Sequence, residues 1–308
     1  MRLLHLLLAS VTFLALALAL LGCDGSVAAP GRPWHQAVLA VYPTSADTPV
    51  GKSDDPAGVR GDDSARLRGK VHLGTRRPNI QQLNDRLMNS IRRHPEADEL
   101  LRAPQEELTQ QYWRVSQDGS VADVVVWLKP PAGRYLTIAP GPPTWPSRIV
   151  LQAGRAAFLP HIRVAFPAYR DPENGARSIR TEQKLLLRNA SPRPHNVSWG
   201  DGGPNPRTTV PLAAGAEMLL PDLKPSANPV RFTTEYPWMT AHVWVFDHPY
   251  ASVTATDGEY EIDNVPIGVP VRVVAWHEWV GFLAGGKDGT EVTLRPGENT
   301  FNFEIDLR

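Results

Sequence analysis

The sequence predicts a mainly β protein with one short helix, preceded by an N-terminal targeting segment. The 308 residues include 30 prolines and 24 glycines, which suit short strands joined by turns better than a helix bundle. From residue 148 onward, short apolar runs are separated by Pro, Gly, Asn or Asp, as in a β-sandwich. Leu83, Leu87 and Ile91 recur four residues apart, which predicts one amphipathic helix near 80–94.

The N-terminus has the features of a signal peptide. A basic start at Arg2 is followed by an apolar run over 3–21, a pattern typical of secretion signals, although a membrane helix of this length is an alternative. The run ends in "LLGC", which resembles the bacterial lipobox and implies cleavage after Gly22 and lipidation of Cys23. We therefore expect a lipoprotein signal over 1–22 and a membrane anchor of acyl chains on Cys23. The expected location is the bacterial cell envelope, on the periplasmic or outer face; an ordinary secretory signal with a chance cysteine is the alternative.

A polar segment follows the signal. The stretch "TSADTPVGKSDDPAGVRGDDSAR" is rich in Asp, Ser, Pro and Gly and poor in large apolar residues. Such a composition buries too little surface to offset its ordering entropy. This predicts a flexible tether over 23–66.

Local sequence patterns predict the strands and turns that follow the tether. "RGKVHLG" alternates like a strand, and after the helix two strand-like runs flank Asp118 and Gly119, a hairpin signal. Residues 124–128 are apolar at consecutive positions, which predicts a strand buried on both faces. Asp257 and Gly258 predict another hairpin turn near the C-terminus.

Composition excludes several functions. The net charge is zero, so no basic field is available to bind nucleic acid. The single cysteine, Cys23, excludes an internal disulfide and a thiolate metal site in the folded part. The sequence contains neither a G-x-S-x-G elbow nor an H-E-x-x-H motif, and we expect no enzyme.

Three stretches carry a family resemblance. "AAFLPHI", "LLLRNASPRPHNVSW" and "PWMTAHVWVFDHPYASVT", within about 148–255, together resemble bacterial secreted cupredoxin-like proteins of the plastocyanin-like or methylamine-utilisation type. The resemblance implies a Greek-key β-sandwich, assigned to 137–247.

The same resemblance implies a copper site that has lost ligands. The family's cysteine position falls on Thr233 and its second histidine position on Tyr236, whereas His195 and Met239 are retained. A blue-copper site needs two imidazoles, a thiolate and a weak axial thioether, so we expect no copper cofactor. Two other family cysteines fall on Ala156 and near Asp98, and any disulfide between them would be lost as a pair.

The ends of the folded part carry a second resemblance. "TATDGEYEIDNVPIGVPVRVVAWHEWVG" resembles the closing half of a carboxypeptidase-regulatory-like, transthyretin-like sandwich, and Gly69–Val71 with Ala122–Pro130 resemble its opening half. We assign the opening strands, with a helical insert, to 67–136 and the closing strands to 248–308. The cupredoxin-like unit would then lie inside or beside a split sandwich, which requires Val124–Trp127 to pair in the same sheet as Val271–Ala275.

Two functions follow from these resemblances. The first is a binding or scaffold module without copper, whose partner is an envelope protein or a glycan. Trp199 and Trp279 are candidates for sugar stacking if they are exposed, and are otherwise packed between sheets. Glu278 is not expected to pair with its neighbour His277, because adjacent strand residues point to opposite faces.

The second function is an envelope metal-binding or electron-transfer protein with a non-standard copper site. Its ligands would be His195, Met239, His161 and His242, with adventitious zinc as a further alternative. Each histidine also has a structural interpretation. His161 would be a strand-end residue bonded to backbone, and His242 would be half-buried on a strand.

Overall fold

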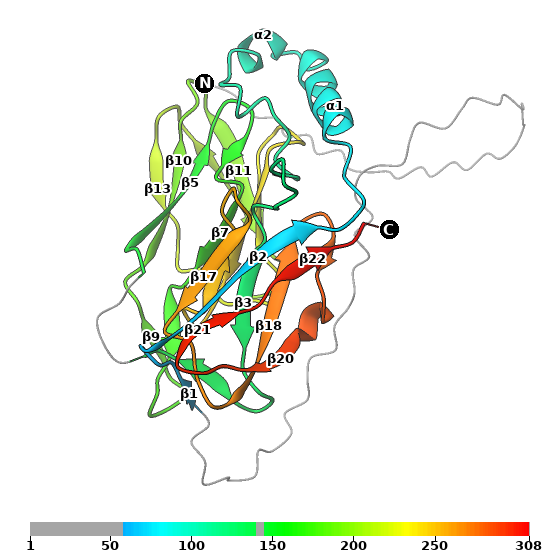
Figure 1. Cartoon of the computed structure of the whole chain (residues 1–308). Helices are drawn as coiled ribbons and strands as arrows, with labels where there is room; N and C mark the ends of the chain where they lie inside the picture. Colours follow the sequence, from blue (N-terminus) through cyan, green and yellow to red (C-terminus); the bar gives the residue numbers. More distant parts are fainter. Residues whose placement is uncertain (1–57, 140–144, 308) are drawn as a thin grey trace, which may run out of the picture. The chain divides into compact units, whose positions relative to one another are not determined.

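The computed structural model describes residues 58–139 and 145–307 (Figure 1). The predicted signal peptide, Cys23 and most of the predicted tether lie outside these residues. The described part has the predicted class: it is mainly β, with packed sheets and few helices. No helix within it is both long and apolar enough to cross a bilayer.

The tether prediction is wrong at its C-terminal end. Gly58–Arg60 forms β1, which pairs in parallel with β4 (Tyr135–Thr137), and β2 begins at Ala65 and runs to Leu73. Val59 is buried. Strand hydrogen bonds and this burial stabilise residues that composition alone assigned to the tether.

Two sheets form a first sandwich. The four-stranded sheet has the order β13-β10-β5-β6, and the five-stranded sheet has the order β12-β11-β14-β15-β7. Pairing is antiparallel except for two parallel contacts, β5 with β10 and β7 with β15. The strands are β5 (Arg148–Ala153), β6 (Phe158–Leu159), β7 (Ile162–Ala165), β10 (Lys184–Asn189), β11 (His195–Gly200), β12 (Thr208–Leu212), β13 (Glu217–Leu219), β14 (Val230–Thr233) and β15 (Thr240–Val245). A short hairpin of β8 (Ala168–Arg170) and β9 (Ser178–Arg180) accompanies them.

The first core lies between these two sheets. The alternating inward residues Leu151, Leu187, Val197, Phe232 and Val243 are almost inaccessible to solvent. The chain passes repeatedly from one sheet to the other, so strands distant in sequence share this core.

A second sandwich is built from both ends of the described chain. One sheet has the order β16-β3-β18-β19, with β20 also on β18; the other has the order β17-β2-β21, with β22 also on β2. The remaining elements are β3 (Val125–Lys129), β16 (Ala251–Val253), β17 (Glu259–Asp263), β18 (Pro270–His277), β19 (Gly281–Phe282), a 3₁₀ turn (Gly286–Asp288), β20 (Thr290–Thr293), β21 (Gly297–Thr300) and β22 (Phe303–Ile305).

The pairing required for a split sandwich is present. In the antiparallel register of β3 with β18, Val126 faces Ala275 and Trp127 faces Val274. The first sandwich therefore lies, in sequence, between two strands of the second. The domain boundaries assigned above remain predictions.

The Asp257–Gly258 turn forms, but the predicted hairpin does not. Gly258 has φ of +76°, and a Cβ there would lie 2.7 Å from the Val71 carbonyl oxygen. The strands on either side, β16 and β17, belong to different sheets of the second sandwich. The turn therefore carries the chain from one sheet of the second sandwich to the other. The apolar residues of β16 pack in the layer between the sandwiches, whereas those of β17 pack in the core of the second sandwich.

A third apolar layer joins the two sandwiches. Trp127 and Trp276 from the second sandwich pack against Ile162, Trp244 and Phe246 from the first. Val126 and Leu128, on the opposite face of β3, belong to the core of the second sandwich. The prediction that 124–128 is buried on both faces is confirmed, and the reason is that β3 lies between two apolar layers.

The predicted helix is α1, Ile80–Arg92, and a short α2, Ala97–Leu100, follows it. The Asn79 side chain caps α1 by accepting a hydrogen bond from the Gln82 N–H at 2.9 Å. Leu83 packs against the second sandwich, whereas Ile91 is buried in the first. Figure 1 shows α1 and α2 close together, beside one end of the sheets.

Candidate functional site

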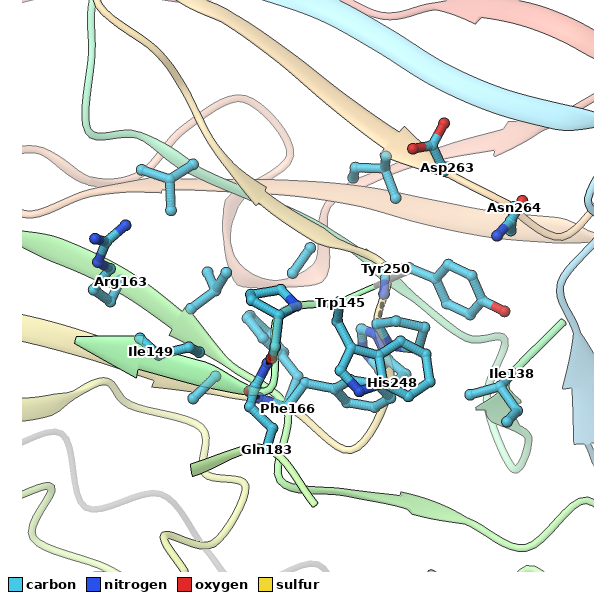
Figure 2. A pocket seen from close by; sticks show the side chains of 18 of the residues that line it. Ile138, Trp145, Ile149, Arg163, Phe166, Gln183, His248, Tyr250, Asp263 and Asn264 are labelled. Atoms are coloured by element: carbon cyan, nitrogen blue, oxygen red, sulfur yellow. Dashed lines mark hydrogen bonds between the residues drawn. The ribbon is translucent and has the colours of Figure 1, made fainter. Parts of the chain in front are cut away.

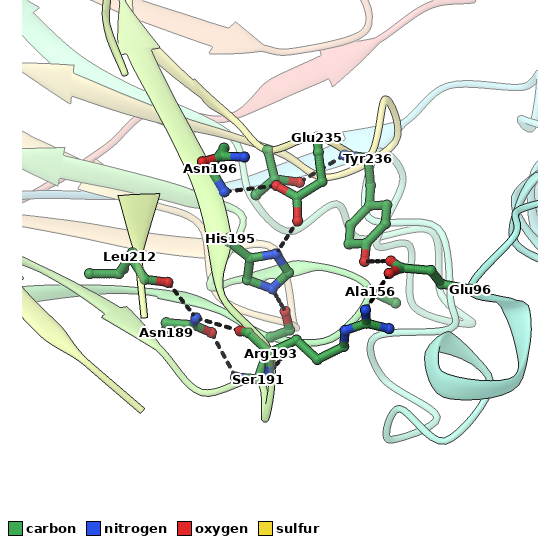
Figure 3. Close-up of polar contacts among 12 residues, drawn as sticks. Glu96, Ala156, Asn189, Ser191, Arg193, His195, Asn196, Leu212, Glu235 and Tyr236 are labelled. Carbon is green, nitrogen blue, oxygen red and sulfur yellow. Dashed lines mark hydrogen bonds and ion pairs between the residues drawn. The ribbon is translucent and has the colours of Figure 1, made fainter. Parts of the chain in front are cut away.

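The expected copper end of the first sandwich is closed by hydrogen bonds (Figure 3). His195 begins β11 and its side chain is buried. Its Nδ1 lies 2.8 Å from a Glu235 carboxylate oxygen, and its Nε2 lies 2.8 Å from the Gly154 carbonyl oxygen. Both ring nitrogens are therefore engaged, and His195 would have to break one of these two hydrogen bonds to ligate a metal.

Tyr236, at the expected second histidine position, is held in place by a residue outside the first sandwich. Its hydroxyl donates to the Glu96 carboxylate, at the start of α2, and Glu96 also pairs with Arg193 at 2.6 Å. The ring stacks on Trp238 at a centroid distance of 5.5 Å. Burial first, and then the hydrogen bond to Glu96, raise the pKa of Tyr236 well above its usual range. The ring therefore remains a neutral phenol that fills the corner.

The other two expected ligand positions do not complete a site. Met239 is fully buried in the first core. Thr233 pairs with Ser198 and Thr240, whereas the inward Phe232 pairs with Trp199 and Ala241. Side chains alternate along a strand, so the register places Thr233 on the sheet face opposite the core. The prediction that Thr233 occupies the thiolate position is wrong in space, because a side chain there faces away from His195.

The two expected cysteine positions lie beside an ion pair. Arg155, next to Ala156, pairs with Glu99, next to Asp98. The Ala156 N–H donates to a Glu107 carboxylate oxygen at 2.9 Å. Polar contacts thus join the loop before β6 to the α2 segment.

A different cluster joins the two sandwiches. His161 precedes β7, His242 lies on β15, and Glu278 directly follows β18. His161 Nε2 lies 2.6 Å from one Glu278 oxygen, and His242 Nδ1 lies 3.3 Å from the other. The side chains are 1%, 14% and 6% exposed, respectively. The four-residue set predicted from sequence is therefore divided, with His161 and His242 in this cluster and His195 and Met239 at the closed end.

The charges in this cluster follow from burial and proximity. Burial opposes a charge on His161, but attraction to Glu278 outweighs it and raises the pKa of His161. Burial likewise opposes a charge on Glu278, yet the neighbouring His161 holds the pKa of Glu278 well below its usual range. Burial lowers the pKa of His242, which stays neutral. The cluster is an ionised carboxylate between a cationic and a neutral imidazole.

The structure corrects the sequence interpretation of these histidines. His161 is bound to a carboxylate rather than only to backbone, whereas His242 is half-buried as expected. Glu278 was not predicted as a site residue. Its signal in the sequence was a lone acidic residue at the end of the apolar run "VRVVAWHEW".

The two tryptophans considered for sugar stacking differ in exposure. Trp199 is buried, and its ring stacks on Phe232 in the first core, so it is not a surface site. Trp279 is 45% exposed and lies 5.6 Å from the Tyr112 ring. Tyr112 in turn lies edge-on to His161.

A cavity of about 520 Å³ is lined by residues of both sandwiches (Figure 2). Trp145 and Phe166 make an edge-on aromatic pair at 4.8 Å. Gln183 orders this wall, because its amide oxygen accepts from the Phe166 N–H at 2.7 Å and its amide nitrogen donates to the Pro146 carbonyl at 2.9 Å. Other lining residues are Ile138, Ile149, Arg163, His248, Tyr250, Asp263 and Asn264. Concavity, aromatic walls and a few polar groups are typical of a small-ligand site.

Comparisons with known proteins identify no family. No family model and no curated protein matches the chain. Among solved structures, the chain is similar to one described as a novel purple cupredoxin from Nitrosopumilus maritimus. The identity is 13%, the match covers 32% of this chain and 98% of that one, and the TM-score is 0.22. A score this low does not establish a common fold, and the mainly β class rests on the sheets described above.

Proposed function

We propose that the protein is an envelope lipoprotein, anchored through Cys23, whose cupredoxin-like unit works without copper as a binding or scaffold module. The observation that carries the proposal is the closed state of the expected copper end. His195 has no free ring nitrogen, and the Tyr236 hydroxyl is bound to Glu96.

Ligand chemistry supports this function over electron transfer. A blue-copper centre depends on a soft thiolate, and the sole cysteine of the sequence is Cys23, at the expected lipidation site. Met239 offers a thioether, but Thr233 faces the other side of the sheet. Electron transfer through His195 and Met239 is therefore the less favoured alternative, and the proposal includes no catalytic activity.

The cavity gives the binding module a place for a ligand. Its volume of about 520 Å³ suits one or two sugar units or a short peptide side chain better than a protein face. Trp145 supplies an aromatic surface, and Arg163 and Asp263 supply polar groups. Sugar rings stack on aromatic side chains and hydrogen-bond to such groups. We propose an envelope glycan as the ligand, with an envelope protein as the alternative partner.

The anchor is tested by fatty-acid labelling and fractionation. Full-length protein should sediment with membranes and incorporate a labelled fatty acid, whereas a Cys23→Ser variant should incorporate none, because the acyl chains are carried by Cys23. Equal labelling of the two proteins would remove the lipid anchor at Cys23 from the proposal.

The ligand is tested with soluble fragments of envelope polysaccharide on a glycan array. Trp145→Ala should weaken binding by about tenfold, the effect of losing one stacking surface. Trp279→Ala is the matched control, since it removes an exposed tryptophan that does not line the cavity. Absence of glycan binding by the parent, or equal losses in the two variants, would contradict the cavity as the glycan site.

A further inference from the structure

The cluster of His161, His242 and Glu278 supplies three metal-ligating groups from separate elements. One ligand atom from each residue, two imidazole nitrogens and a carboxylate oxygen, lies within 4.8 Å of the other two. The residues come from β15 and from segments bordering β7 and β18. The cluster thus lies where the five-stranded sheet of the first sandwich meets the β3–β18 sheet of the second.

Two imidazoles and a carboxylate form a known type of zinc ligand set. Zinc bonds to these atoms are about 2.0–2.2 Å long, and three protein ligands leave a fourth position for water. Ligand atoms around a tetrahedral ion are then about 3.3 Å apart. The separations of 2.6 and 3.3 Å run to the two different oxygens of Glu278. In the set with one ligand atom from each residue the separations reach up to 4.8 Å, so the longest would have to shorten by about 1.5 Å as the side chains close on the ion.

The surroundings favour holding an ion once it has entered. Tyr112 lies edge-on to His161 at 6.0 Å, and Trp276 lies edge-on to His242 at 5.5 Å. Such apolar walls strengthen charge interactions inside them. His242 is the most exposed of the three ligands, with 14% of its side chain accessible to solvent.

Some neighbouring charges oppose a bound cation and others favour it. Arg231 stands opposite His242 in the β14–β15 register and opposes a cation. Asp123 is buried, carries φ of +61° and influences both His161 and Glu278 electrostatically. Asp123 is itself paired with Arg114 at 3.6 Å, which partly neutralises its negative charge when it is ionised.

We propose that His161, His242 and Glu278 bind one divalent transition-metal ion of the zinc type, which ties the two sandwiches together. Binding releases to solvent the proton that His161 shares with Glu278, and the ion then bonds to the freed imidazole nitrogen, to His242 and to the carboxylate. This site is separate from the expected copper end and goes beyond the function proposed above.

The test is metal stoichiometry on the tag-free chain with Cys23→Ser, stripped with chelator and dialysed against Zn²⁺ or Co²⁺. We expect about one equivalent per chain, a melting temperature raised by several degrees, and the strong visible bands of four-coordinate Co²⁺. Glu278→Gln should lower the affinity for Zn²⁺ at least tenfold, as loss of a first ligand requires. His242→Gln, at the most exposed ligand, provides a second variant if Glu278→Gln does not fold.

Glu235→Gln is the matched control, because it makes the same substitution in the other histidine–carboxylate pair, His195 with Glu235. It should leave zinc binding unchanged. If the parent binds no zinc, or if the folded Glu278→Gln or His242→Gln variant binds it as tightly as the parent, the cluster is only an ion pair and the proposal fails. Loss of zinc in Glu235→Gln would instead place the ion at the copper end and overturn the function proposed above.

Discussion

Glu235 and Glu278 each pair with a buried histidine, but water reaches them to different extents. The Glu235 side chain is 34% exposed, whereas that of Glu278 is 6% exposed. A charge that loses its partner inside the protein is far more costly than one that water can still solvate.

We therefore predict that Glu278→Gln lowers the free energy of unfolding of the metal-free protein by about 3 kcal/mol. Glu235→Gln should lower it by about 1 kcal/mol or less. Urea unfolding at pH 7 in the presence of chelator measures both. Equal effects would show that burial does not set the strength of these pairs.

Tyr236 gives a second prediction at this scale. Tyr236→Phe removes the hydrogen bond to Glu96 but keeps the stack on Trp238, and Glu96 retains Arg193 as a partner. The loss in unfolding free energy should be about 1 kcal/mol, typical of one hydrogen bond. A loss above about 3 kcal/mol, the size associated with an unpaired buried charge, would mean that Arg193 does not compensate for the missing hydroxyl.

The sequence predicts the role of a single residue only where a composition count or a local motif depends on that residue. The expectation of no copper cofactor rests on the absence of a cysteine from residues 24–308, and it stays a prediction. Glu278 could not be assigned, because its partner His161 is 117 residues away in sequence. Thr233 was misplaced because motif spacing along the chain does not report which face of β14 a side chain occupies.

Among the secondary-structure elements, α1 connects two cores. Its first turns contact the second sandwich through Leu83, and its last turn inserts Ile91 into the first. The helix and the following α2 thus bring Glu96 and Glu99 to the end of the first sandwich, where they pair with Arg193 and Arg155.

This arrangement makes Ile91 a stability determinant. Ile91→Ala should lower the unfolding free energy by about 3 kcal/mol, because Ile91 is fully buried and its truncation leaves a cavity. Leu101→Ala, 38% exposed just beyond α2, should cost about 0.5 kcal/mol or less. Thermal or urea unfolding distinguishes them, and a small effect of Ile91→Ala would mean that the helix is not part of the first core.

The sequence predicts the helices and turns better than it predicts which strands pair with one another. The helix followed from a four-residue repeat, and the turns at Gly119 and Gly258 form with positive φ. Local sequence could not show that the Gly258 turn crosses between sheets, because that depends on which strands pair with β2 and β3.

At the scale of the whole described chain, three apolar layers alternate with the four larger sheets. The chain leaves the second sandwich after β3, builds the first, and returns at β16. The layer between the sandwiches is lined by Trp127, Trp244 and Trp276. Consecutive apolar residues at 124–128 predicted a strand buried on both faces. Only the structure shows which layer covers the second face of that strand.

Burial of His248 makes the molecule sensitive to acid. Burial lowers the pKa of His248 to about 4, opposed by the neighbouring Asp247, and its Nδ1 accepts the Tyr250 N–H at 3.2 Å. His248 binds a proton near pH 6.5 in the unfolded chain but only near pH 4 in the folded chain. The stabilisation is therefore present above pH 6.5 and is lost as the pH falls through this window.

The expected size is about 2 kcal/mol lost between pH 7 and pH 5 from this residue. His248→Asn retains a side-chain acceptor and should reduce the pH dependence of the unfolding free energy by that amount. Urea unfolding of parent and variant at the two pH values measures it. An unchanged pH dependence would contradict a neutral, buried His248.

Hydrogen bonds to both ring nitrogens of His195 close the expected copper end of the first sandwich. The most direct measurement is copper per chain after loading the parent and a His195→Ala variant with Cu(I) and Cu(II) and dialysing. We expect equal copper content in the two proteins and no intense visible absorption typical of a thiolate–copper bond. Copper that the parent retains and His195→Ala loses would show that His195 ligates a metal and that this end of the sandwich is open.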